Sequence, residues 1–354
     1  MKVVFFIHSL RSGGAERVLS LLANDWINHG HDITIAVNDI NEVFYPINNQ
    51  INIIDIGVQH KGIAKGITAN VARVIKIKQT IVDTDPDIVI SFMTTMNIKV
   101  TLASRLAKKP IIISERTSFD ALKSRAWRTL RRIIYPYSSA LIVQTVQAAK
   151  SYDFLSNLKI IENPLILQNK HLNLKREKVI LAVGTLYSVK GFDMLINAFS
   201  KLKNIDGWKL VILGEGEDRK KLENQIKQLD LSEKVLLPGT VSDVEFHYKK
   251  ASIFVLSSRT EGFPNALCES MANGCPSIAF DCLTGPSEII NHPHNGILVE
   301  AENIPELTQA MQDLADNPEK RKSISKESKK LADRLSINTI SSKWFEAIDN
   351  VRNP

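Results

Sequence analysis

Residues 257–273 read SSRTEGFPNALCESMAN and follow a short apolar run at residues 251–256. The run predicts a buried strand, a loop with a glycine and a proline comes next, and Asn265 opens a predicted helix. The first N–H groups of a helix lack intrahelical partners and lie at the positive end of its dipole, so this turn predicts an anion site. Glu261 and Glu269 flank the turn. A structural turn with two solvated glutamates fits the stretch as well, and the stretch alone leaves both interpretations open.

Length and composition indicate a globular protein of two domains. The chain has 354 residues, of which 44% are hydrophobic and 23% are charged. Its apolar runs are no longer than strands, so no transmembrane helix is expected, and MKVVFFIHSLR at the start does not resemble a signal peptide. The formal net charge of +7 predicts an acidic partner, either phosphate groups or an anionic membrane surface. Nucleic acid is not expected, since no motif for it is present.

The three cysteines carry no expected chemistry. Cys268, Cys275 and Cys282 form no CxxC pair, and Gly274 and Pro276 would break a helix through them. They are predicted to be small buried hydrophobic residues in a reducing cytoplasm rather than metal ligands.

The first half of the chain opens with a strand, a glycine loop and a helix. Residues 2–8 predict a central parallel strand, and Gly13 and Gly14 precede an amphipathic helix at residues 15–23. This is the opening βα unit of a doubly wound sheet, with ligands expected at the loop, although a tight turn without ligand explains the glycines equally well.

Two overlapping DxD triplets in residues 83–87 resemble a metal site on a sugar-nucleotide. They precede the predicted strand at residues 88–92, whereas ligands of open α/β sheets lie at the carboxyl ends of strands, so they are predicted to be a decoy. Arg116 follows the predicted strand at residues 110–114 and is placed to meet an anion there.

A basic helix is predicted from Leu122 to Ile134, where five lysines and arginines alternate with tryptophan and aliphatic residues. An interfacial helix on anionic lipid and a partly buried helix with a solvated basic face both explain this pattern.

The second half repeats the βα series after a polar linker at residues 165–178. A strand at residues 179–183 leads into a loop from Gly184 to Gly191, where Lys190 can neutralise a leaving phosphate. The last predicted helix, at residues 337–351, is expected to return to the first domain.

Taken together, these motifs resemble those of retaining glycosyltransferases with the GT-B fold, family 4. The resemblance spans the whole chain and rests on the motifs SGGAER at residues 12–17, KG at 190–191, GEG at 214–216, EGFPNALCE at 261–269 and GPSE at 285–288. It implies an α/β fold with two Rossmann-like doubly wound domains facing a central cleft. The implied domains are an acceptor-binding domain at 1–165, a nucleotide-sugar-binding domain at 178–335, and a C-terminal helix at 336–354 that crosses back.

The resemblance also implies the roles of individual residues. The catalytic set would be Glu261, which contacts the donor sugar, Lys190, which stabilises the leaving diphosphate, and Arg116. The nucleotide-sugar site would comprise Gly14, Gly184, Lys190, Glu261, Gly262, Phe263, Pro264, Asn265, Ala266, Leu267 and Glu269. No metal and no cofactor is implied, and the UDP-sugar is the donor substrate.

The chain departs from the family pattern at two places. Many members carry arginine where this chain has Thr185, so either Arg116 or another cation substitutes, or the leaving group is stabilised more weakly. The family's histidine near the anomeric carbon is represented only by His8, at the end of a predicted strand.

The implied activity is transfer of a hexose or N-acetylhexosamine from a UDP-sugar to a polyprenyl-diphosphate-linked saccharide in the synthesis of O-antigen, capsule or a similar bacterial glycan. The enzyme would be cytoplasmic and held at the inner membrane by the basic helix. Two alternatives remain: a UDP-sugar epimerase with the same fold, and a non-catalytic nucleotide-sugar-binding protein.

Overall fold

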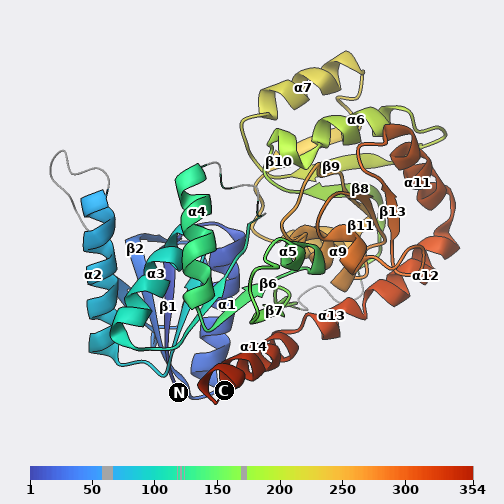
Figure 1. The fold of residues 1–354 in the computed structure, drawn as a ribbon. Coiled ribbons are helices and arrows are strands. Elements are labelled where there is room, and N and C mark those ends of the chain that lie inside the picture. The colour runs from blue at the N-terminus through green and yellow to red at the C-terminus, as the bar shows by residue number, and fades with distance from the viewer. Residues whose placement is uncertain (58–66, 118, 120–121, 123, 169–173, 354) are drawn as a thin grey trace. The chain divides into compact units, whose positions relative to one another are not determined.

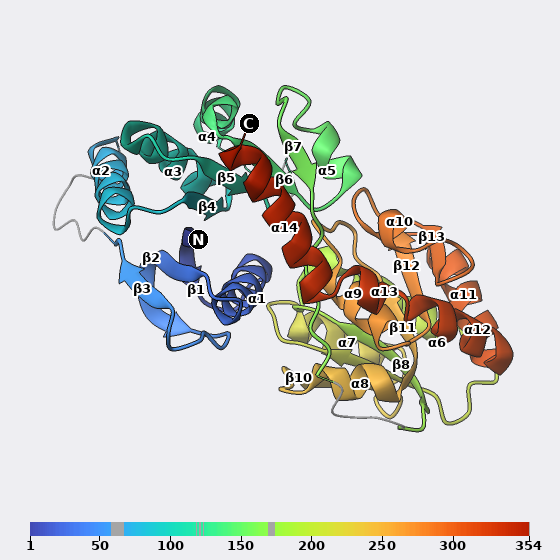
Figure 2. The ribbon, with the colours of Figure 1, turned by 90° about the horizontal axis from the view of Figure 1, so that it is seen from below.

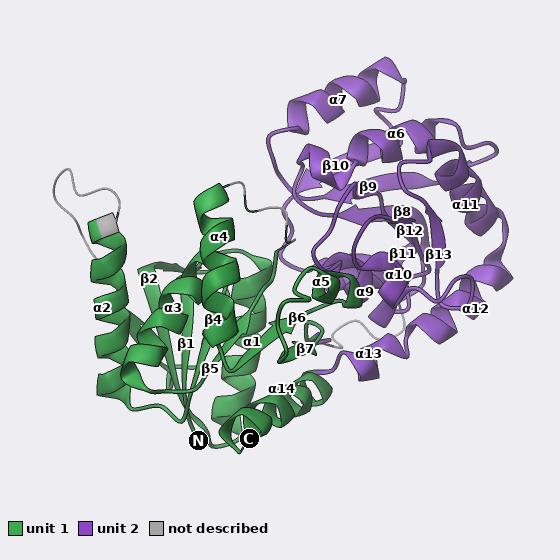
Figure 3. Cartoon of the chain, in the orientation of Figure 1, with its two compact units in different colours: residues 1–164, 337–354 green, residues 165–336 purple. Residues whose placement is uncertain are grey.

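The computed structural model describes residues 1–57, 67–117, 119, 122, 124–168 and 174–353. The chain divides into two compact units: unit 1 is Met1–Pro164 with Ile337–Pro354, and unit 2 is Leu165–Ser336 (Figure 3). Lys123 of the predicted basic helix and residues 169–173 of the predicted linker lie outside the described residues. The described part of that linker belongs to unit 2.

Unit 1 is built on a seven-stranded sheet in the order β3-β2-β1-β4-β5-β6-β7, and all of its strand pairs in the described residues are parallel. The strands are β1 (Lys2–Leu10), β2 (Asp32–Val43), β3 (Asn52–Asp55), β4 (Ile88–Phe92), β5 (Ile111–Ser114), β6 (Ala140–Val143) and β7 (Leu158–Ile160). The central strand β1 pairs with β2 on one side and β4 on the other, so the chain reverses its winding between β1 and β4.

Helices cover both faces of this sheet (Figures 1 and 2). They are α1 (Gly14–Asn28), α2 (Ile67–Thr84), α3 (Thr94–Ala107), α4 (Arg125–Ile134), the 3-10 turn η2 (Tyr135–Tyr137), α5 (Val146–Lys150) and α14 (Ile337–Arg352). The inward side chains of α2, α3 and α4 join one core cluster with β4, β5 and β6. On the other face, α1 and α14 pack together with β1 and β4 through aromatic side chains.

Unit 2 repeats the doubly wound plan with six parallel strands in the order β10-β9-β8-β11-β12-β13. The strands are β8 (Glu177–Val183), β9 (Lys209–Leu213), β10 (Val235–Gly239), β11 (Ala251–Leu256), β12 (Ser277–Asp281) and β13 (Ile297–Glu300). Its helices are η3 (Ser188–Lys190), α6 (Phe192–Ser200), α7 (Arg219–Gln228), α8 (Val244–Lys250), α9 (Asn265–Ala272), α10 (Pro286–Ile289), α11 (Ile304–Asp316), α12 (Pro318–Ser328) and α13 (Leu331–Arg334). Its winding reverses between β8 and β11.

The two ends of unit 2 meet each other. Leu165 and Ser336 form a parallel bridge, and the Leu165 N–H donates to the Leu335 carbonyl at 2.7 Å. Unit 2 is therefore inserted into unit 1, between β7 and α14.

The α/β prediction with two doubly wound sheets is confirmed. The three cysteines are free and buried, as predicted. The DxD triplets lie before β4: Asp85 pairs with Lys109 at 2.6 Å, and Asp87 accepts from the backbone N–H of Lys2 at 2.8 Å. None of the helices in the described ranges combines the length and apolar composition needed to cross a membrane.

Helix α14 completes the aromatic core of unit 1. Trp344 is fully buried, and its ring centroid lies 6.1 Å from that of Trp26 and 6.2 Å from that of Phe92. The Trp26 indole donates to Ser341 at 3.0 Å, and the Ser341 hydroxyl donates to Asp25 at 2.6 Å.

We expect Trp344→Ala to destabilise unit 1 by about 3–5 kcal/mol, because it leaves a cavity beside two aromatic rings. Hydrogen exchange of unit 1 amides measures this loss. The control is Ser342→Ala on the exposed side of the same helix, which should change the stability by about 0.5 kcal/mol or less. Equal effects of the two variants would contradict the role of α14.

Candidate active site

The candidate site of unit 2 lies where the winding of its sheet reverses. The loop after β8 carries Lys190 and the loop after β11 carries Glu261, and β8 and β11 are neighbours in the sheet. Carboxyl ends of parallel strands on either side of such a switch point form the crevice where open α/β sheets bind ligands. The topology therefore brings these two predicted site residues to one place, although they are far apart in sequence.

Lys190 and Glu261 form an ion pair there. Lys190 Nζ lies 2.7 Å from Glu261 Oε1, and the exposed fractions of the two side chains are 24% and 8%. Ser258 donates to the same carboxylate oxygen at 2.7 Å, and the Thr284 hydroxyl donates to the Glu261 carbonyl. The carboxylate is thus held by a cation and a hydroxyl, and its charge is compensated.

The backbone around the pair is close-packed. Gly191 has φ +64°, and a Cβ on it would collide with the carbonyl oxygen of Ser257. The Ser257 hydroxyl donates to the Lys190 carbonyl at 2.9 Å, and the Arg259 N–H donates to the Val189 carbonyl at 2.8 Å. Only glycine at position 191 allows the two loops to approach this closely.

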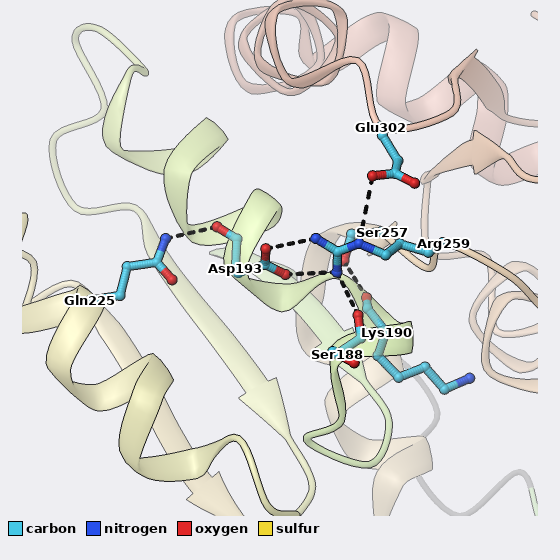
Figure 4. Close-up of polar contacts among 7 residues, drawn as sticks. All are labelled: Ser188, Lys190, Asp193, Gln225, Ser257, Arg259 and Glu302. Atoms are coloured by element: carbon cyan, nitrogen blue, oxygen red, sulfur yellow. Dashed lines mark hydrogen bonds and ion pairs between the residues drawn. The ribbon is translucent and has the colours of Figure 1, made fainter.

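A second charged cluster ties the same two loops together (Figure 4). The Arg259 guanidinium donates to both carboxylate oxygens of Asp193, at 3.0 and 2.7 Å, and also to the Ser188 carbonyl. Glu302 lies 3.6 Å from Arg259 Nε. Partial burial acts to raise the pKa of Asp193, but the hydrogen bonds and charge of Arg259 outweigh it and lower that pKa, while the Asp193 carboxylate raises the pKa of Arg259. Figure 4 shows the Lys190 side chain extending away from Arg259, so the two cations have separate roles.

Pro264 precedes α9, and its side chain makes no capping hydrogen bond. Residues 262–264 lead into the helix and residues 265–267 form its first turn. Binding of a diphosphate by residues 262–267 stays a prediction. Gly285 approaches this segment, because a Cβ there would lie 2.6 Å from Pro264 Cδ. Glu269 lies on α9, half-buried, and accepts from the Tyr248 hydroxyl at 3.1 Å.

Gly184 directly follows β8 and lies against Gly214, which has φ +140°. The next residue, Thr185, has an uncharged side chain. Gly14 begins α1 of unit 1, where Gly13 precedes the helix without a side-chain cap. Gly14 and Arg116 thus belong to unit 1, whereas the other predicted site residues belong to unit 2.

Arg116 is held inside unit 1. Its guanidinium lies 5.2 Å from the Phe92 ring and 5.8 Å from the Trp344 ring, and it donates to Asn163. Burial lowers its pKa to about 9. These contacts give Arg116 a packing role, and its role in catalysis stays a prediction.

His8 lies at the switch point of unit 1. Its Nδ1 is 2.9 Å from the Asn38 amide nitrogen, and its Nε2 is 2.7 Å from the Thr95 hydroxyl. Because an amide nitrogen only donates, His8 accepts at Nδ1 and carries its proton on Nε2. Burial lowers the pKa of His8, and the cations Lys99 and Arg73 lower it further.

Three sets of contacts within the two units were not predicted from the sequence. Ser258 and Thr284, which hold Glu261, are common residue types in ordinary loops. Arg176, within the predicted linker, donates to the carbonyls of Tyr248, Ala251, Asn273 and Gly274, and so joins the start of β11 to the end of α9. The fully buried Glu115 accepts from Thr94, Asn97 and Tyr135, and burial raises its pKa.

Known protein families match both halves of the chain. Residues 12–154 match the family described as Glycosyltransferase Family 4, and residues 166–331 match the one described as Glycosyl transferases group 1. An uncharacterized glycosyltransferase of Haemophilus influenzae is 32% identical over 97% of this chain and 98% of its own length.

Two further comparisons extend over nearly the whole chain. A Campylobacter jejuni enzyme that adds GalNAc to a GalNAc-GalNAc-diNAcBac-PP-undecaprenol is 30% identical over 100% of this chain and 99% of its own. The crystal structure of Anabaena HepE in complex with UDP superposes with a TM-score of 0.80 at 18% identity, covering 98% of this chain and 99% of that one.

We expect Lys190 and Glu261 to be energetically coupled. A double-mutant cycle with Lys190→Met and Glu261→Gln should give a coupling energy of about 1–3 kcal/mol in the stability of unit 2, because each single change leaves a partly buried charge uncompensated. The control is the cycle for the exposed pair Lys330–Glu327, which should give about 0–1 kcal/mol. Coupling no larger than the control would show that the pair does not hold the loops.

The lowered pKa of His8 predicts a pH dependence. Between its usual value of about 6.5 and its lower folded value, the unfolded chain binds a proton that the folded chain does not, so stability falls as the pH drops through this window. The slope of unfolding free energy against pH should be shallower in His8→Gln. An unchanged slope would contradict the burial of His8 as a neutral group.

Proposed function

The chain belongs to family 4 of the glycosyltransferases, a retaining family with the GT-B fold, and from that premise we propose that it transfers a hexose or N-acetylhexosamine from a UDP-sugar to a saccharide on a polyprenyl diphosphate. The product would enter a bacterial surface polysaccharide. The observation that carries this proposal is the ion pair of Lys190 with Glu261 at the switch point of unit 2, in the loops that lead into α6 and α9.

In the proposed reaction, the diphosphate of the donor lies against the backbone of residues 262–267, where every residue except Pro264 has an N–H group. The Glu261 carboxylate accepts hydrogen bonds from hydroxyls of the donor sugar, and the Glu269 carboxylate accepts them from the ribose hydroxyls. As the bond from the anomeric carbon to the leaving UDP breaks, negative charge grows on the diphosphate, where Lys190 and the dipole of α9 stabilise it. The acceptor hydroxyl enters from the same face, its oxygen bonds to the anomeric carbon and its proton passes to the leaving diphosphate, so the configuration is retained and no protein nucleophile is required.

A cationic cluster in unit 1 supports a diphosphate acceptor. Lys99 is buried, its Nζ lies 5.4 Å from the Trp127 ring, and burial together with Arg73 lowers its pKa. Neither Lys99 nor Arg73 pairs with a carboxylate within the described ranges, and both act on His8. Unpaired cations beside the carboxyl ends of β1 and β4 favour an anionic ligand. The same cations are the reason to expect a phosphorylated acceptor rather than a neutral sugar.

The proposed location is the cytoplasmic side of the inner membrane, reached through α4. One face of this helix fits the partly buried alternative, and the proposed lipid contact uses its other face. Arg131 is buried and its guanidinium lies 3.5 Å from the Phe119 ring, and Trp127 packs against the core, so these two do not face outward as part of a basic surface. Arg125, Arg128 and Arg132 are exposed and remain available to lipid.

The test is release of UDP from a panel of UDP-sugars, with and without a polyprenyl-diphosphate saccharide. Release that depends on acceptor establishes the transferase and identifies its donor. Turnover of donor without acceptor would favour a UDP-sugar epimerase, and binding of UDP-sugar without turnover would favour a non-catalytic binding protein. Either result overturns the proposal.

We expect Lys190→Ala to lower the transfer rate about 10²- to 10³-fold, because the leaving diphosphate loses its cation. Glu261→Gln should also lose most of the activity. Glu327→Gln and Lys330→Ala, which alter an exposed ion pair of unit 2, are the matched controls and should keep the wild-type rate. Wild-type activity in Lys190→Ala would rule out the proposed role of this residue.

A further inference from the structure

The outer surface of unit 1 has an unusual share of exposed aliphatic side chains. Helices α2, α3 and α4 lie side by side over one face of the sheet (Figures 1 and 2). Their inward residues join a single core cluster. Between 36% and 63% of the surface of each of the following residues is nevertheless exposed: Val71, Ile75 and Val82 of α2, Leu102 and Leu106 of α3, and Leu130 and Ile133 of α4. We call this surface the helical face.

The charge of the same three helices is strongly one-sided. They contain a single acidic residue, Asp83, at the end of α2. Their nine basic residues are Arg73, Lys76, Lys78, Lys99, Arg105, Arg125, Arg128, Arg131 and Arg132. Lys99 and Arg131 are buried, Arg73 is half-buried, and the other six are exposed. A surface that mixes exposed aliphatic side chains with cations and almost no acids complements an anionic lipid layer.

A hollow of about 390 Å³ lies at the end of α3. It is lined by Ser104, Arg105, Lys108, Lys109, Ile111, Tyr137 and Ser139. The Arg105 guanidinium lies 4.8 Å from the Tyr137 ring, which fixes its direction. Lys109 pairs with Asp85, whereas Arg105 and Lys108 have no carboxylate partner in the part of the chain that the structure describes. Two cations beside hydroxyl groups form a binding site suited to a phosphate.

Two further observations indicate that the side chains of Arg105 and Lys108 and the Ser104 hydroxyl are available to a ligand in this hollow. The last carbonyls of α3 already accept from the backbone: the Lys108 N–H donates to Arg105 and the Lys109 N–H to Ser104. The side chains of Arg105 and Lys108 are therefore not needed to cap the helix. The Ser104 hydroxyl is buried and has no hydrogen-bond partner among the described residues. A buried hydroxyl without a partner costs free energy that a bound ligand or water would restore.

We propose that the helical face docks on an anionic phospholipid surface and that the hollow at the end of α3 holds a lipid phosphate headgroup. The aliphatic residues of α2, α3 and α4 enter the boundary between headgroups and acyl chains, while Arg105 and Lys108 bind phosphate. This extends the membrane contact proposed for α4 to the whole helical face. It rests on that contact but not on the sugar-transfer chemistry.

The test is flotation of the full chain with vesicles, without donor or acceptor. The chain should float with vesicles of phosphatidylcholine and phosphatidylglycerol and should not float with phosphatidylcholine alone. Arg105→Gln with Lys108→Gln should weaken binding about 30-fold, because each cation near an anionic surface contributes about a factor of five. Leu106→Gln with Ile75→Gln should weaken it at high salt as well as at low salt, since an apolar contact is not screened.

The matched control is on unit 2, where Lys220→Gln, Lys227→Gln and Leu229→Gln alter exposed residues of α7 and its end. These variants should float like the wild type. A wild-type chain that does not float, or a control that loses as much binding as the variants of the helical face, overturns the proposal. A third arm adds inorganic phosphate in a thermal-shift measurement: stabilisation that Arg105→Gln with Lys108→Gln removes, without flotation, would assign the hollow to soluble phosphate and overturn the lipid docking. Because no arm requires UDP-sugar, these outcomes are independent of the transferase test.

Discussion

The contact on which the site of unit 2 depends is the ion pair between Lys190 and Glu261. It connects the loops that follow β8 and β11, the two strands between which the sheet reverses its winding. Neither loop has much regular structure of its own, so a charge contact 2.7 Å long fixes one against the other. In a partly buried position this attraction is little screened by salt, and it holds a lysine and a carboxylate together in the loops that lead into α6 and α9.

The same site has a structural support that is separate from its chemistry. Arg259 binds Asp193 through two hydrogen bonds and reaches the Ser188 carbonyl, so the loop of Lys190 is held from its outer side. Arg176 binds four carbonyls at the far ends of β11 and α9. A strand and helix fixed at both ends can present the loop between them in one conformation. Two arginines thus position the turn through contacts that do not involve the Lys190 ammonium group.

Much of the fold follows from local sequence patterns. The buried apolar runs of β1, β4, β8 and β11 and the amphipathic helices between them predicted both doubly wound sheets. The short elements α5 and β7 were not predicted, because five and three residues are too few to show a period.

The site was less predictable than the fold. The sequence motifs identified both Lys190 and Glu261 as site residues. They did not predict that the two side chains form an ion pair, because that contact depends on the order of the strands in the sheet. The sequence pattern placed Arg131 and Trp127 in one basic helix without indicating which of its residues face inward. In the structure one face of α4 packs against the core, and both residues lie on that face. Arg176 lay in a stretch without periodicity, and nothing local to it indicates four carbonyl acceptors contributed by distant residues.

The insertion of unit 2 into unit 1 sets an order of events during synthesis. The ribosome releases α14 only after all of unit 2, so the face of the unit 1 sheet around Trp26 and Phe92 stays uncovered while more than 170 residues are made. The two ends of unit 2 are joined by the bridge between Leu165 and Ser336, so unit 2 can fold as soon as all of it has left the ribosome. The nascent first domain, although translated first, is therefore the last to become complete, and it is the one that a chaperone has most reason to bind.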